Sequence, residues 1–162
     1  MHNEKPDTRT KIIETTADII GREKNLNMTI RDIANKADVN VASVNYYFGS
    51  KDNLMAEVQL LLMERIRSLY DNLGNSGLPV TERLIDWADS LVRHLIEFPG
   101  IIYLIGTRVL ERSNTGLDLY LKLLETEIFP LVKDITNADD QTTGYKVLHL
   151  ISGLVYPVLI YS

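Results

Sequence analysis

Apolar residues recur at helical spacing along almost the whole chain, and the alternation typical of β-strands is nearly absent. In the first such segment, Ile13, Ala17 and Ile20 share one face of a helix that we expect from about Thr8 to Lys24, with Asn25 as a left-handed stop. Hydrophobic residues make up 45% of the 162 residues, which suffices for a substantial core. The chain is therefore predicted to be all-α.

Breaks in the periodicity divide the chain into two domains. We expect a helix-turn-helix domain at residues 1–50 and a helical regulatory and dimerisation domain at residues 51–162. A long helix over residues 51–73 connects them, and the Gly-, Ser- and Pro-containing loop at residues 74–80 is the clearest boundary. The expected helices of the second domain lie at residues 81–98, 99–112, 116–135 and 139–161.

Two short helices joined by a tight turn form the centre of the first domain. Thr29 is expected to cap the first of them, with Asp32 as the acidic partner of a capping box. The second runs from Val41 to Tyr47 after the turn at residues 37–40. Its inward residues are predicted to pack with those of the first helix in a small core that contains Ile33, Ala34, Val39, Val44 and Phe48.

The opposite face of this second helix carries small and polar side chains that are poor choices for a core: Asn40, Ala42, Ser43, Asn45, Tyr46 and Tyr47. Asparagine reads base edges, hydroxyl groups bind phosphates, and alanine permits close approach to a groove. The pattern is that of a DNA-binding helix-turn-helix. A generic helical hairpin is the alternative that the periodicity alone leaves open.

The segment TIRDIANKADVNVASVNYYFGSKDNL closely resembles the DNA-binding signature of TetR (tetracycline repressor-like) transcriptional regulators. The resemblance covers residues 8–55 and continues beyond them only as helix number and order. Two positions depart from the signature. Asp38 stands where the turn usually has Gly, although Asp tolerates the left-handed conformation, and Tyr47 replaces the usual His.

The resemblance implies two sets of DNA contacts. Contacts with base edges or the groove fall to Arg31, Asn40, Val41, Ala42, Ser43 and Asn45. Phosphate contacts fall to Thr29, Tyr46, Tyr47 and Lys51, of which Lys51 also sits at a helix N-terminus. Core packing is the alternative role for Tyr46, and a solvated charge is the alternative for Arg31.

Composition excludes several other classes of protein. There are no cysteines, so disulfides, thiolate metal sites and a Cys nucleophile are excluded. The three histidines lack ligand-like spacing, no phosphate loop or catalytic motif appears, and we expect neither a metal, a cofactor nor an enzymatic activity. The net charge of −5 lies entirely beyond residue 53, because basic and acidic residues are equal in number before it.

The N-terminus lacks a signal-peptide pattern, and we expect no stretch long and apolar enough to span a membrane, hence a soluble cytoplasmic protein.

The resemblance implies that the second domain forms a homodimer and holds a small-molecule effector. The last helix is too apolar for a solvated surface, and its expected dimer contacts are Val147, Leu150, Ile151, Leu154, Val155 and Val158. Candidates for a ligand pocket combine apolar walls with a few polar groups: Trp87, Leu91, His94, Tyr103, Thr107, Arg108, Tyr120 and Leu124. Ordinary core or surface roles are the alternative for each of these.

The function expected from the sequence is a sequence-specific, dimeric transcriptional repressor that a small-molecule effector releases from an inverted-repeat operator in double-stranded DNA. Two alternatives remain. One is a helical small-molecule-binding or scaffold protein whose head has lost DNA binding, and the other is a DNA-binding factor without an effector.

Overall fold

A computed structural model describes the backbone of residues 7–74, 77–111 and 114–161; the side chains of residues 72, 104, 107–111, 114–117 and 119 lie outside the description. Within this part of the chain every regular element is a helix, as predicted. The elements are α1 Thr8–Glu23, α2 Ile30–Lys36, α3 Val41–Phe48, α4 Lys51–Ser68, η1 Asp71–Gly74, α5 Val80–Glu97, α6 Gly100–Glu111, α7 Asn114–Leu123, η2 Leu124–Ile128, α8 Phe129–Thr136 and α9 Asp140–Tyr161.

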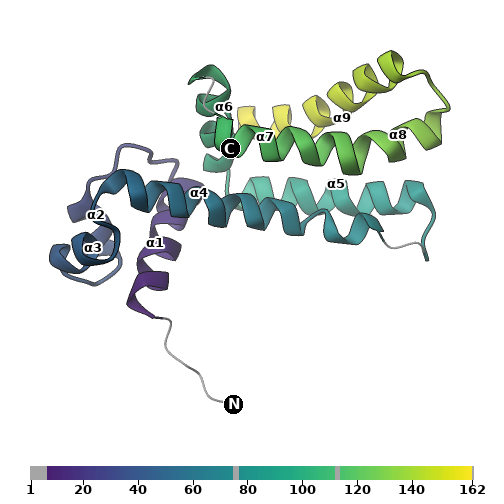
Figure 1. The fold of residues 1–162 in the computed structure, drawn as a ribbon. Coiled ribbons are helices and arrows are strands. Elements are labelled where there is room, and N and C mark those ends of the chain that lie inside the picture. The colour runs from purple at the N-terminus through teal and green to yellow at the C-terminus, as the bar shows by residue number, and fades with distance from the viewer. Residues whose placement is uncertain (1–6, 75–76, 112–113, 162) are drawn as a thin grey trace.

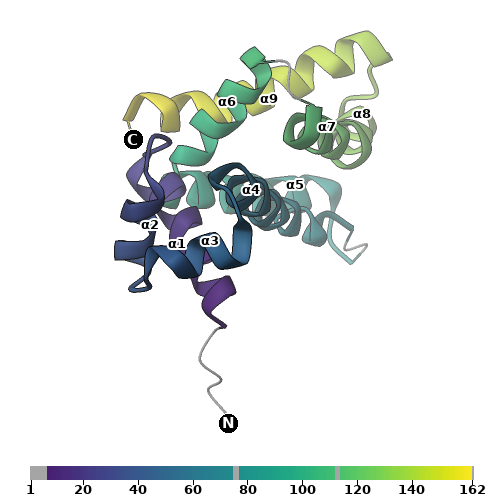
Figure 2. The same ribbon diagram turned by 60° about the vertical axis from the view of Figure 1, so that its left-hand side comes forward.

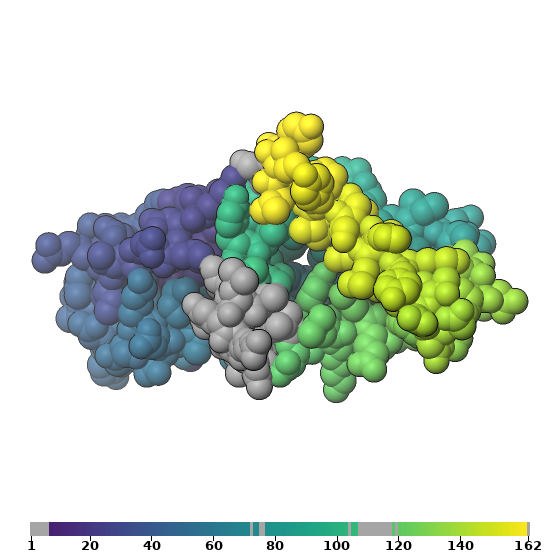
Figure 3. Space-filling view, turned by 90° about the horizontal axis from the view of Figure 1, so that it is seen from above, coloured from purple at the N-terminus to yellow at the C-terminus, as the bar shows by residue number. Residues whose placement is uncertain are grey.

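The helices form a head of α1 to α3 and a longer body that α4 enters from the head (Figure 1). In the body, α4 and α5 lie beneath α7 and α8, and α9 turns back along α8 and α5 toward the head (Figure 2). The space-filling view shows α9 stretched across one face of the molecule (Figure 3). The returning helix therefore brings the end of the described chain close to the head.

The head has the small core that the sequence predicts. Val44 and Phe48 of α3 are buried, as are Ile33 and Ala34 of α2, while Val39 is partly buried against them. Because α1 places Ile12 and Ile20 beneath both short helices, one face of each is held inward and the other is left at the surface.

Four local expectations differ from the structure. The left-handed residue after α1 is Lys24 (φ 55°), one position before Asn25. The fourth helix stops at Ser68, and a short 3-10 turn follows at Asp71–Gly74. The expected helix over residues 116–135 is divided by the π-helical turn η2. Pro130 explains this division, because it has no N–H to donate to the carbonyl of Thr126 and its ring crowds that carbonyl.

The fourth difference concerns membranes. Helix α9 is long and apolar enough to cross a membrane by length and composition, and only 17% of its most apolar window is buried in the chain. The expectation that no stretch meets this test is therefore wrong for α9.

Head and body meet at a backbone contact between α1 and the start of α6. Gly100, buried at the first position of α6, lies so close to α1 that a Cβ there would stand 1.7 Å from the carbonyl oxygen of Ile20. Gly21 lies against Phe98 in the same way, with 2.7 Å between a Cβ and the Phe98 Cδ1. Around this contact, which we call the joint, Arg22 donates to Glu97 at 2.6 Å and stacks over Phe98.

Gly100→Ala should lower the free energy of unfolding by about 2 kcal/mol or more, because the added methyl group must push α6 away from the Ile20 carbonyl. Gly106→Ala in the same helix is the matched control, since a Cβ there meets nothing within 4 Å. It should be neutral or stabilise the protein by up to about 1 kcal/mol through helix propensity. Urea unfolding of the two variants measures the difference, and equal stabilities would contradict the close contact.

Candidate nucleic-acid interface

The interface begins at the N-terminus of α2, where Thr29 and Asp32 form the predicted capping box. The Thr29 hydroxyl oxygen accepts from the Asp32 backbone N–H at 3.2 Å, and the Thr29 N–H donates to the Asp32 carboxylate at 2.8 Å. These bonds from the Thr29 backbone and hydroxyl lower the pKa of Asp32 below its ordinary value. The first turn of α2 is thus held by its own side chains at the surface.

The turn between α2 and α3 adopts the left-handed conformation expected at Asp38, whose φ is 50°. Its N–H and that of Val39 donate to the carbonyls of Asn35 and Ala34, which closes the C-terminal end of α2. Asn40 then caps α3, because its side-chain oxygen accepts from the Ser43 N–H at 2.9 Å. The side-chain oxygen of Asn40, a predicted base reader, is therefore used by the helix cap. Its side-chain amide nitrogen remains as the group that can donate to a base.

The outer face of α3 is open to solvent. Tyr46 is 83% exposed, Val41 and Tyr47 are exposed to 39% and 37%, and Ala42 and Asn45 are exposed beside them. The rings of Tyr46 and Tyr47 meet edge to face with centroids 5.2 Å apart. Core packing, the alternative role considered for Tyr46, does not fit this exposure.

The remaining predicted contacts flank that face. Thr29 and Arg31 are exposed at the start of α2, and Ser43 is half-buried in α3. Lys51 is half-buried in the first turn of α4, where Ser50 caps the helix by accepting from the Asn53 N–H at 3.2 Å. All ten predicted DNA-contact residues thus lie at the surface of one helix-turn-helix and of the helix end that follows it.

One supporting contact was not predicted from the sequence. Arg9 of α1 pairs with Glu57 of α4, and its guanidinium carbon lies 5.6 Å from the centre of the Phe48 ring. The contact ties the end of α3 to the two longer helices. Glu57 lies 48 residues after Arg9, so no local pattern in the sequence predicts the pair.

The predicted ligand residues are not gathered in one cavity. Leu91 and Tyr120 line a small cavity of about 70 Å³ in the body, and burial there raises the pKa of Tyr120 to about 12. Trp87 packs on Tyr70 in the core, Tyr103 is 41% exposed, and Leu124 lines a different groove beside α9. The side chains of Thr107 and Arg108 lie outside the described residues.

His94 is half-buried at the joint rather than in the body cavity. Its ring lies 5.1 Å from that of Phe98, and burial together with the charge of Arg65 lowers the pKa of His94. Arg65 itself pairs with Glu14 of α1. His94 is therefore part of the contact between head and body.

The residues predicted for a dimer seam mostly face inward. Val147 and Val158 are each only 6% exposed, and the other four are partly buried against the core. The outward face of α9 carries a different set, which we call the α9 stripe: Tyr145, Leu148, Ser152, Tyr156 and Leu159. The exposure of Tyr145, Leu148 and Tyr156 is 57%, 60% and 63%.

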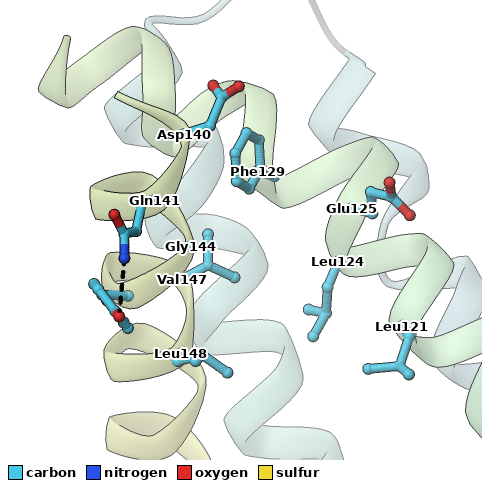
Figure 4. Close-up of a pocket in the computed structure, with 10 residues that line it drawn as sticks. Leu121, Leu124, Glu125, Phe129, Asp140, Gln141, Gly144, Val147 and Leu148 are labelled. Atoms are coloured by element: carbon cyan, nitrogen blue, oxygen red, sulfur yellow. Dashed lines mark hydrogen bonds between the residues drawn. The ribbon is translucent and has the colours of Figure 1, made fainter. Parts of the chain in front are cut away.

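A groove of about 390 Å³ runs beside this stripe (Figure 4). Leu121, Leu124 and Glu125 line one side, and the first turns of α9 line the other, where Gln141 donates to the Tyr145 hydroxyl at 3.4 Å. Leu148 belongs to both the groove and the stripe. The two features therefore form one continuous, largely apolar surface.

Comparison with known proteins agrees with the geometry of the head. Residues 12–58 match the family model of the bacterial regulatory proteins of the tetR family. The head therefore resembles the DNA-binding part of that family. The match begins in α1 and ends in α4, and so contains the whole helix-turn-helix.

Two curated regulators are also similar to part of this chain. The HTH-type transcriptional regulator BetI of Agrobacterium fabrum is 39% identical over 73 residues, which are 45% of this chain and 32% of that regulator. BetI of Brucella anthropi is 33% identical over 75 residues, or 46% of this chain and 39% of that regulator. The similarity thus spans 32% of the length of the first relative and 39% of the second.

The fold of head and body together resembles that of a solved TetR transcriptional regulator from Legionella pneumophila. The TM-score is 0.73 at 20% sequence identity, over 97% of this chain and 88% of that one. The body is therefore similar in fold to that protein.

The capping carboxylate predicts a pH dependence of stability. Because the pKa of Asp32 is lowered in the folded protein, its contribution is present above its ordinary pKa of 3.8 and is lost as the pH falls through the folded value. Asp32→Asn should therefore be less stable than the wild type at neutral pH, with the difference vanishing in acid. Asp86→Asn, an exposed position inside α5, is the control. Urea midpoints from pH 7 to pH 3 test this, and a pH-independent difference would contradict it.

Proposed function

We propose that this chain is a sequence-specific DNA-binding transcriptional regulator that reads a DNA groove with α3. The observation that carries the proposal is the division of α3 into a buried back, with Val44 and Phe48, and an exposed face of small and polar groups. A helix of this kind enters the major groove and places hydrogen-bonding groups at base edges.

The two sets of contacts differ in what they contribute. Asn45 lies exposed in the middle of α3 and is the proposed base reader, together with Arg31, Val41, Ala42, Ser43 and the Asn40 amide. Lys51, Thr29, Tyr46 and Tyr47 surround that face and are the proposed phosphate contacts. Base contacts select the sequence, whereas phosphate contacts set position and overall affinity.

We further propose that the regulator acts in the cytoplasm as a homodimer whose seam is the α9 stripe with its groove. The stripe residues follow one another at three- and four-residue steps, so they form one apolar band along the helix. A monomer that left this band in water would expose a large apolar patch, which is typical of an interaction surface. The groove accepts side chains of a partner helix, as in an isologous contact.

A small-molecule effector that releases this dimeric repressor from an inverted-repeat operator completes the proposal. A single helix-turn-helix buries little DNA surface, so two heads at a set separation are needed for useful affinity. A ligand that alters the position of either head relative to its body would then weaken binding.

Selection of bound sequences from a random pool of double-stranded DNA tests the proposal. Enrichment of an inverted repeat supports a dimeric regulator. No enrichment at low salt would overturn DNA reading and favour the scaffold alternative.

A pair of substitutions separates base reading from phosphate contact. Lys51→Ala should weaken binding to all sequences about equally and make the salt dependence shallower by roughly one unit. Asn45→Ala should instead reduce the ratio between operator and random DNA by about tenfold. Fluorescence anisotropy at several salt concentrations measures both. A changed sequence preference in the first variant, or an unchanged ratio in the second, would reverse the assignments.

The dimer seam predicts the effect of a charge in the α9 stripe. Leu148→Glu should raise the dimer dissociation constant at least about tenfold, because a carboxylate would be buried against an apolar partner. Leu60→Glu is the matched control, since Leu60 is 70% exposed on α4 and lies outside the stripe. Sedimentation equilibrium gives the constants, and an equal effect of the two substitutions would place the seam elsewhere.

A further inference from the structure

We propose that a cavity between α1, α5 and α9 binds an uncharged, mostly apolar molecule that carries one hydrogen-bond donor. The cavity has a volume of about 760 Å³, which lies in the range of sites for drug-sized ligands. The body cavity of about 70 Å³ beside Tyr120 is too small for such a molecule. We call the larger space, which the ends of all three helices line, the joint cavity.

The walls of the joint cavity are largely apolar. Val92 and Ile96 of α5 form one side, and Leu154 and Val158 of α9 form another. Ile96 is 62% exposed although it is a large aliphatic residue. An apolar ligand held between these helices would remove that surface from water.

One backbone carbonyl on the α9 wall lacks its usual helical donor. Pro157 lies inside α9 and has no N–H, so the carbonyl of Gly153, four residues earlier, receives no hydrogen bond from that position. Gly153 and Pro157 both line the joint cavity and are both exposed. A Cβ at Gly153 would meet no atom within 4 Å, so space is open beside this residue. The wall therefore offers a hydrogen-bond acceptor within an apolar surface.

The charges at the rim of the joint cavity are balanced. Arg22 pairs with Glu97 at 2.6 Å and with Asp18 at 3.5 Å, and Lys24 also interacts with another group. These four side chains bring two positive and two negative charges, which add up to zero. An ionic ligand against apolar walls is unfavourable unless a charge compensates it, and a rim without net charge compensates neither sign. The ligand is therefore uncharged, and its hydroxyl or N–H donates to the Gly153 carbonyl.

The proposed dimer seam leaves this cavity free. At 100° per residue, the α9 residues that line the joint cavity are centred on the opposite side of the helix from the α9 stripe. A partner chain seated on the stripe would leave them uncovered. A carbonyl that needs a donor is satisfied by a ligand hydroxyl and not by an apolar helix face, which favours a small ligand over a second copy of the chain.

The position of the joint cavity suggests what its ligand does. Arg22 belongs to the helix that carries the head, while Glu97 and Pro99 flank the Phe98 ring that packs on Gly21. A bound molecule would contact both parts of the chain and favour the arrangement of head and body that fits it. The joint cavity is thus the site that we assign to the effector. This regulatory effect rests on the proposed DNA-binding function, whereas occupation of the cavity does not.

Calorimetric titration of the intact chain with 1-naphthol, which is uncharged at neutral pH, tests the binding site. We expect saturable binding with one ligand per chain. Methoxynaphthalene, which has the same rings and no donor, should bind about three- to tenfold more weakly, the contribution of one hydrogen bond. Naphthoate and naphthylmethylammonium should each bind at least about tenfold more weakly than naphthol, because each brings a charge.

A matched pair of prolines tests the carbonyl. Pro157→Ala restores an N–H that can donate to the Gly153 carbonyl, so the preference for naphthol over methoxynaphthalene should fall to about one. The ratio is diagnostic because loss of the proline ring from the wall affects both ligands alike. Pro130→Ala should leave the ratio unchanged, since Pro130 lies in α8 and lines none of the cavities described above.

A matched pair of glycines tests the space. Gly153→Phe should weaken naphthol binding at least about tenfold, because the ring would occupy the cavity beside the carbonyl. Gly106→Phe should leave binding within about twofold, since Gly106 is exposed in α6 and lines none of these cavities. A Cβ at either glycine meets nothing within 4 Å, so circular dichroism should show both variants folded.

Four outcomes would overturn the proposal: no saturable binding of naphthol, an unchanged ratio in Pro157→Ala, equal losses in the two glycine variants, or tighter binding of either charged analogue. A lower mass of Gly153→Phe together with no naphthol binding to the wild type would also overturn it and identify a second copy as the occupant.

The titrations contain no DNA, so failure of the proposed DNA-binding function leaves their results unchanged. In a separate measurement, naphthol should weaken operator binding by the wild type and not by Gly153→Phe. An operator affinity of the wild type that naphthol leaves unchanged would overturn the regulatory role.

Discussion

The arrangement of this molecule depends on how closely two backbones approach at the joint. The start of α6 lies against the carbonyl end of α1 because Gly100 has no side chain, and Phe98 reaches α1 because Gly21 has none. The positive end of the α6 dipole thereby faces the negative end of α1, which adds electrostatic attraction to the packing. Arg22 and Glu97 close the same contact from outside.

This contact explains how the head is presented. Helix α1 supplies Ile12 and Ile20 to the core of the head and also touches α4 and α6 of the body. The orientation of α3 is therefore set by packing against α1, α2 and α4.

Local features of the fold were predictable from the sequence because local chemistry determines them. The capping box at Thr29 and Asp32, the left-handed Asp38 and the inward Val44 all depend on residues within a few positions of one another. The exposed polar face of α3 follows from the same periodicity. The π-helical turn before Pro130 also had a local signal, since proline interrupts helical hydrogen bonding.

Contacts between distant segments could not be predicted in this way. The residues around Gly21 do not predict that Phe98 packs against it. Likewise, the residues around Arg9 do not predict its ion pair with Glu57. Helix α9 posed another difficulty, because a helix that is apolar nearly all round has no distinct buried face. Val147 and Val158 were therefore expected at a dimer seam, whereas the structure buries them within the chain.

The joint also has a consequence for exchanging parts between regulators. A boundary at residue 50 looks natural, since α4 begins at Lys51, yet it would separate α1 from Phe98 and Gly100, which contact its last turns. In a chimera that takes only the head, Ile20 and Gly21 would face the body of another regulator. That body would have different residues at the positions of Phe98 and Gly100. The unit that can be transferred intact is therefore the head together with residues 98–100. These two stretches are distant in sequence and adjacent only in the folded chain.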